Sequence, residues 1–254
     1  MNFLRYRANG ETHVGVLEGD QVRQAQGDMF ERPQVGPIVG HVDEVEILAP
    51  VIPSKLIAIG LNYQDHIDED AFDFEQPENP IIFLKPPSSL IGHNQEIILP
   101  AGTERVDAEA ELCVVIGRTC RNVKAEDAYD VIFGFTNGND VSARDFQFKD
   151  GQWVRAKGFD TFSPLGPSIV TGIRADDLDV VSRVNGEVHQ SSSTRHLIFD
   201  VPYLIEFISR VMTLNQGDVI MTGTPAGPPK LSAGDVCEVE VAGLGVLRNP
   251  VVSE

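Results

Sequence analysis

The chain has 254 residues, of which 42% are hydrophobic and 23% are charged, as is usual for a globular protein with a full core. Its formal net charge of −18 argues against a nucleic acid or an anionic membrane surface as partner. The three cysteines show no Cys-x-x-Cys spacing and indicate neither a disulfide framework nor a zinc cluster. Because the sequence shows no apolar segment of membrane-spanning length and no signal-peptide pattern, we expect a cytoplasmic protein.

Residues 1–54 are predicted to form a small N-terminal β-rich domain. Turn-forming pairs at Asn9-Gly10 and Gly19-Asp20 separate short strand-like segments. Residues 27–40 are rich in proline and glycine, and we expect them to be irregular. Two further prolines close this part, so the domain boundary is placed after residue 54.

Residues 55–254 are predicted to form the larger domain. It begins with a buried type of strand over 55–60, and about two helical turns follow over 62–69. The acidic segment 70–79 is expected to be a loop. The uninterrupted apolar residues 114–116 predict a strand that is buried on both faces.

Later in the chain, Asn185-Gly186 lies between two strand-like segments and predicts a hairpin with a type I′ turn. Asp200 is expected to cap a helix over 201–214, and the alternation in 237–241 predicts a strand with one buried face. Strands outnumber helices in this assignment. The predicted fold class is therefore α+β and β-rich.

Three carboxylates stand out as candidate metal ligands. Glu109 and Glu111 point to the same face if their segment is a strand, and the sequence becomes wholly apolar directly after them. A Glu-x-Glu pair is most often a solvated polar face, but this one adjoins buried surface. Asp140 also follows an apolar strand-like segment. Three carboxylates without cysteine or paired histidine favour Mg²⁺ or Mn²⁺, with Ca²⁺ as a further candidate.

His66 and Glu69 form a second candidate group. At a spacing of three residues they share one face of a helical turn, so the carboxylate could orient the imidazole or share a proton with it. The alternative is an ordinary surface ion pair on an exposed helix.

Further candidates follow Asp140 and lie near the C-terminus. Arg144, Gln147 and Lys157 would suit an anionic substrate beside a metal, or would simply balance a crowded acidic patch. Thr224 lies in a glycine-containing turn after an apolar strand, where a hydroxyl and backbone N–H groups can bind a carboxylate. A plain strand-ending turn is the alternative there.

From about residue 55 to the C-terminus, the chain resembles the fumarylacetoacetate hydrolase family. The matching segments occur in the family's order: GLNYQDH (60–66), FLKP (83–86), VDAEAEL (106–112), NDVSARD (139–145), AKGFD (156–160), VNGE (184–187) and TGTP (222–225). Seven ordered segments make the resemblance specific. The N-terminal part is similar to the small extra domain of some members.

The resemblance implies a mixed β-sandwich roll, a homodimer, and a divalent metal bound by Glu109, Glu111 and Asp140. It places His66 and Glu69 on a lid, where they handle a water molecule or a proton.

By the same resemblance, Lys157 and Gln147 contact the substrate, Arg144 supports the site and Thr224 binds a carboxylate. A 2-oxo acid can chelate the metal, which then stabilises an enolate. We rank hydrolysis of a C–C bond in an acylpyruvate-type substrate first. The alternatives are isomerisation or decarboxylation of dienols from aromatic catabolism, such as 2-hydroxyhepta-2,4-dienedioate or 5-carboxymethyl-2-hydroxymuconate, and oxaloacetate decarboxylation. A non-catalytic protein that binds 2-oxo acids is the alternative from another class.

Overall fold

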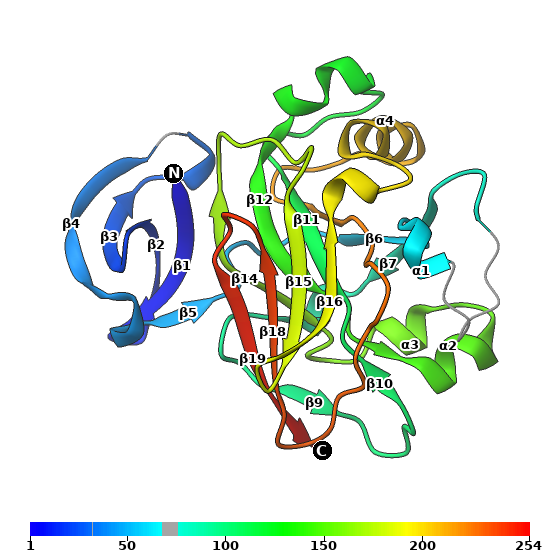
Figure 1. Ribbon diagram of the computed structural model, residues 1–254. Helices are drawn as coiled ribbons and strands as arrows, with labels where there is room; N and C mark the ends of the chain where they lie inside the picture. Colours follow the sequence, from blue (N-terminus) through cyan, green and yellow to red (C-terminus); the bar gives the residue numbers. More distant parts are fainter. Residues whose placement is uncertain (32, 68–75) are drawn as a thin grey trace.

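The computed structural model describes residues 1–31, 33–67 and 76–254. Most of its regular structure is strand, as Figure 1 shows. The strands are β1 (Asn2–Ala8), β2 (Glu11–Glu18), β3 (Gln21–Gln26), β4 (Gln34–His41), β5 (Glu46–Leu48), β6 (Leu56–Gly60), β7 (Ile81–Lys85), β8 (Leu90–Ile91), β9 (Ile97–Leu99), β10 (Val106–Asp107), β11 (Ala110–Ile116), β12 (Ile132–Asn139), β13 (Ser142–Ala143), β14 (Ser163–Val170), β15 (Asp179–Val184), β16 (Glu187–Ser193), β17 (Val219–Met221), β18 (Val236–Val241) and β19 (Val246–Ser253).

The helices are few and short. The α-helices are α1 (Gln64–Ile67), α2 (Arg144–Asp150), α3 (Val154–Lys157) and α4 (Val201–Val211). The 3₁₀ helices are η1 (Met29–Glu31), η2 (Val42–Glu44), η3 (Pro87–Ser89), η4 (Ala125–Asp130) and η5 (Thr194–His196). The predicted α+β, β-rich class is confirmed. In the described part of the chain, no helix is long and apolar enough to cross a membrane.

One large mixed sheet runs through the molecule. Its strand order is β4-β3-β2-β1-β14-β12-β11-β17-β6-β7, and a second sheet with the order β16-β15-β18-β19-β9 lies beside it. The N-terminal strands continue the large sheet because β1 pairs antiparallel with β14, with Phe3 opposite Ile169. The division of the chain after residue 54 stays a prediction.

Strand β11 lies in the middle of this sheet and separates two hydrophobic clusters. Leu112 and Val114 pack into the cluster that contains α4, whereas Cys113 and Val115 face a cluster shared with β14 and β17. All of its residues are buried, as the sequence predicted. Because side chains alternate along a strand, Glu111 lies on the same face as Cys113 and Val115.

The predicted hairpin is confirmed, and the predicted helix end is wrong by three residues. Both Asn185 and Gly186 have positive φ, as a type I′ turn requires. Asp200 caps α4 by accepting a hydrogen bond from the Tyr203 amide at 2.9 Å. The helix ends at Val211 because Leu214 instead exchanges backbone hydrogen bonds with Cys120.

The expectation of irregular structure over 27–40 is also wrong in part. Strand β4 begins at Gln34 although it contains Gly36, Pro37 and Gly40. Its pairing with β3 shifts register twice, so the strand bends around these residues and keeps most of its ladder.

Candidate metal centre

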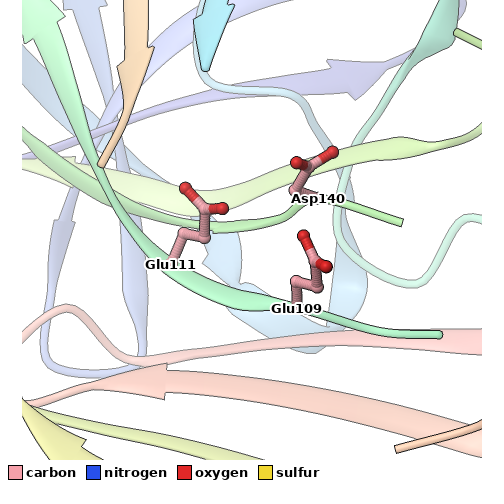
Figure 2. Close-up of side chains that lie close together, drawn as sticks. All are labelled: Glu109, Glu111 and Asp140. Carbon is pink, nitrogen blue, oxygen red and sulfur yellow. The ribbon is translucent and has the colours of Figure 1, made fainter. Parts of the chain in front are cut away.

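The three predicted carboxylates meet at the end of the β11–β12 ladder. Glu111 is opposite Gly138, and the Asp140 amide donates a hydrogen bond to the Glu109 carbonyl at 3.0 Å. One oxygen from each carboxylate lies within 4.8 Å of the others, and all three side chains are buried. Figure 2 shows the three carboxyl groups turned towards one another.

Cationic side chains contact two of these three carboxylates. The Lys157 ammonium bridges Glu109 Oε2 at 2.7 Å and Asp140 Oδ2 at 2.6 Å. Arg144 Nη2 lies 2.5 Å from Glu109 Oε1, and Lys85 donates to Asp140 Oδ1. Burial opposes ionisation of Glu109, but Arg144 and Lys157 hold its pKa below the ordinary value. Glu109 is therefore a stable buried anion.

Glu111 is in a different electrostatic environment. Its described partner is the backbone amide of Gly223, which donates to Oε2 at 2.7 Å. Gly223 has a φ of 102°, and a Cβ there would lie 2.8 Å from the Asn62 side chain, so glycine is required at this position. Burial, then the charges of Asp140 and Glu109, raise the pKa of Glu111 well above its ordinary value.

This imbalance fits a divalent cation. Glu111 lacks the ion pairs that Glu109 and Asp140 have in the described part of the chain. A cation between the three carboxylates would stabilise the ionised form of Glu111 and reduce the repulsion among them. The donor set consists of carboxylate oxygens, which suits hard ions such as Mg²⁺, Mn²⁺ or Ca²⁺.

The predicted site residues that the structure describes all line one cavity. They are His66, Glu109, Glu111, Asp140, Arg144, Gln147, Lys157 and Thr224. They come from the start of β11 and the residue before it, the residue after β12, helices α1, α2 and α3, and the turn after β17. Glu69, the remaining predicted residue, lies outside the described residues. The roles assigned to these residues stay predictions.

Hydrogen bonds hold several of these side chains in place. Arg144 Nη1 donates to Gln147 Oε1 at 2.7 Å, and Thr224 Oγ1 donates to the Ala110 carbonyl at 3.0 Å. Thr224 also accepts a hydrogen bond from Gln190 Nε2 at 2.8 Å. His66 is almost completely buried on the four-residue helix α1.

The sequence prediction missed two buried charged residues that support the site. Asp107 accepts a hydrogen bond from Arg144 Nε at 2.8 Å and also binds Arg105. Lys85 donates to the Phe162 carbonyl at 2.7 Å as well as to Asp140. The sequence did contain a signal for Lys85, which directly follows the apolar residues of β7. A lysine is rarely buried unless it is paired, so one at this position indicates a buried acidic partner.

Comparison with known proteins identifies the family to which this chain belongs. Residues 55–252 match the fumarylacetoacetate (FAA) hydrolase C-terminal family, and residues 1–50 match the Rv2993c-like N-terminal family. The chain therefore belongs to the fumarylacetoacetate hydrolase family, whose enzymes act on small molecules and generally use a divalent metal.

Three relatives bear on the reaction. Rat mitochondrial oxaloacetate tautomerase Fahd2a is 45% identical over 98% of this chain and 79% of its own length. The solved structure of 5-carboxymethyl-2-hydroxymuconate delta-isomerase from Mycobacterium smegmatis is 44% identical, with a TM-score of 0.93 and complete coverage of both chains. That of the fumarylacetoacetate hydrolase from Exiguobacterium antarcticum is 34% identical, with a TM-score of 0.86 and complete coverage of both chains.

Proposed function

We propose that the protein is a Mg²⁺- or Mn²⁺-dependent isomerase that interconverts the keto and enol forms of a small 2-oxo acid such as oxaloacetate. The observation that carries this proposal is the convergence of Glu109, Glu111 and Asp140 in a cavity that His66 and Lys157 also line. A tautomerase and an isomerase that each match nearly the whole chain at more than 40% identity support the same reaction class.

The three carboxylates would hold the metal in this mechanism. When bound, it would supply Lewis-acid stabilisation for negative charge on the keto oxygen of the substrate. Burial opposes the charge on Lys157, yet Asp140 and Glu109 raise its pKa, so the side chain stays cationic. It therefore stabilises negative charge and does not act as a base.

His66 is the proton carrier in the proposed reaction. It takes a proton from the carbon next to the keto group and returns one to the oxygen, so that no atom is gained or lost. An imidazole suits this exchange because one ring nitrogen can accept a proton while the other donates one. Gln147 Nε2 would orient the substrate by donating hydrogen bonds to its carboxylate oxygens. Thr224 would do the same by exchanging its hydrogen bond to the Ala110 carbonyl for one to the substrate.

The second candidate is hydrolysis of a C–C bond, the reaction that we ranked first from the sequence alone. The presence of His66 in the cavity favours it, because attack by water requires a base. The similarity to a named fumarylacetoacetate hydrolase also supports it. The homodimer, the role of Glu69 and the cytoplasmic location stay predictions.

Assays of the Mg²⁺-loaded protein can separate these reactions. We expect faster decay of the enol absorbance of oxaloacetate, inhibition by chelator, and a rate for His66→Ala lower by roughly 10²- to 10⁴-fold. His189→Ala is the matched control, because His189 is exposed on β16. If only cleavage products of acetylpyruvate or fumarylpyruvate form, hydrolysis replaces isomerisation as the main activity.

A further inference from the structure

The cavity has a lining of two kinds. The lining includes the carboxylates and cations of the metal centre and also apolar residues from β6, β7 and the turn between α2 and α3. Trp153 lies in that turn and is the single tryptophan of the chain. Its own carbonyl accepts the hydrogen bond of the Lys157 amide at 3.0 Å. Trp153 is therefore linked directly to the helix that carries Lys157.

Trp153 is packed tightly against the backbone of Gly60. A Cβ added at Gly60 would lie 2.4 Å from Cζ3 and 2.7 Å from Cη2 of the indole, closer than any real contact. Glycine at the end of β6 thus allows the indole to approach the chain closely. The next residue, Leu61, also lines the cavity and has a φ of 55°, which is rare for a bulky side chain.

A second aromatic ring fixes the other edge of the indole. Phe83 of β7 meets Trp153 edge to face, with ring centroids 5.2 Å apart. The ammonium of Lys157 lies 5.2 Å from the centroid of the Phe83 ring, within the range of a cation–π contact. The two rings therefore form a rigid wall directly beside the charged centre.

The space between this wall and the centre is small. The cavity has a volume of about 20 Å³, enough for one or two water molecules, so even a short 2-oxo acid must displace its walls to bind. Arg144 and Lys157, the cations among the described lining residues, are both paired with carboxylates. A substrate tail that extends from the centre towards Phe83 and Trp153 would meet aromatic surface.

We propose that Trp153 is a specificity-determining residue that, with Phe83, limits the length of the substrate tail beyond the 2-oxo acid group. The proposal rests on the proposed function for the chemical class of the ligand. It assigns short-tailed 2-oxo acids to this site and excludes long ones through steric contact with the indole.

A homologous series of 2-oxo acids tests this limit by binding alone. Calorimetry on the Mg²⁺-loaded protein would compare pyruvate, 2-oxobutanoate, 2-oxohexanoate and 2-oxooctanoate. For the wild type we expect affinity to fall roughly tenfold or more between 2-oxobutanoate and 2-oxohexanoate, because one poorly accommodated methylene has an effect of about this size. For Trp153→Ala we expect a fall of less than about threefold over the same step, while the Mg²⁺ affinity stays unchanged.

Two further variants test whether the length limit depends on the size of the side chain at position 153. Trp153→Phe retains an aromatic ring and should lie between the wild type and Trp153→Ala. Phe148→Ala removes an aromatic ring that is 58% exposed on α2 and should keep the wild-type length dependence. The fluorescence of Trp153 in the wild type should change as pyruvate binds.

The outcomes separate this inference from the proposed function. An unchanged length dependence in both Trp153 variants, or unchanged Trp153 fluorescence on binding of pyruvate, overturns the inference even if oxaloacetate is isomerised. A length limit that Trp153→Ala removes supports the inference even if no isomerisation occurs, in which case only the proposed function fails.

Discussion

Glu111→Gln should stabilise the metal-free protein, which is unusual for a change at a buried, hydrogen-bonded residue. The amide keeps an oxygen that can accept the hydrogen bond of the Gly223 amide, and it removes a charge within 4.8 Å of two other carboxylates. At that separation each pair of unit charges repels by about 3 kcal/mol at an effective dielectric constant of 20. The cations that contact Glu109 and Asp140 reduce this repulsion.

Protonation sets an upper limit to the gain. Keeping Glu111 protonated at pH 7, against its ordinary pKa of 4.5, costs about 1.4 kcal/mol per pH unit, or about 3 kcal/mol. We therefore expect a gain of about 2 to 3 kcal/mol, equivalent to a rise in Tm of roughly 5 to 10 °C. Because the folded-state pKa is raised, the stability linked to Glu111 is complete below pH 4.5 and is lost as the pH rises towards that folded-state pKa. The advantage of the variant should accordingly shrink as the pH falls.

With Mg²⁺ bound, the wild type should be more stable than Glu111→Gln, the reverse of the order without metal. At a thousand times its Kd, the ion stabilises the wild type by about 4 kcal/mol, whereas the variant has lost a ligand. Thermal unfolding with chelator and with Mg²⁺ measures both effects. Glu109→Gln is the matched control: it breaks buried ion pairs to Arg144 and Lys157 and should cost about 3 kcal/mol or more without metal. Equal loss of stability in both metal-free variants would refute the reasoning, as would equal stabilisation of Glu111→Gln and the wild type by Mg²⁺.

Two further predictions concern the supporting charges. Lys85→Met leaves Asp140 with one cation fewer and should cost about 3 kcal/mol in chemical denaturation without metal, and less with Mg²⁺. A loss that Mg²⁺ does not reduce would argue against Asp140 as a ligand. Asp107→Asn removes the charge that holds Arg144 and should weaken Mg²⁺ binding by roughly 10- to 100-fold in calorimetry. Unchanged affinity would show that Arg144 needs no such support to position Glu109.

Local patterns in the sequence were enough to single out the three carboxylates that the structure brings together, whereas their role as metal ligands stays a prediction. Glu109 and Glu111 stand at the start of an apolar segment, and the period of a strand places them on one face. The contact of Lys85 with Asp140 joins residues 55 positions apart in the sequence. The contact of Trp153 with Gly60 joins the turn before α3 to the end of β6. No local period encodes such contacts, because the sheet order brings these segments together. Strand β4 was missed for the related reason that pairing with β3 overrides the low strand propensity of Gly36 and Pro37.

The pairing of β1 with β14 has a consequence for shortened versions of the chain. Phe3 packs in the same hydrophobic cluster as Cys113 and Val115, which lie on the same face of β11 as Glu111. A chain that began at residue 55 would expose the backbone edge of β14 at Ile169 and Val170 and open this cluster to water. Unprotected strand edges recruit strands from other molecules. We therefore expect such a fragment to aggregate, although residues 55–252 include every predicted metal ligand.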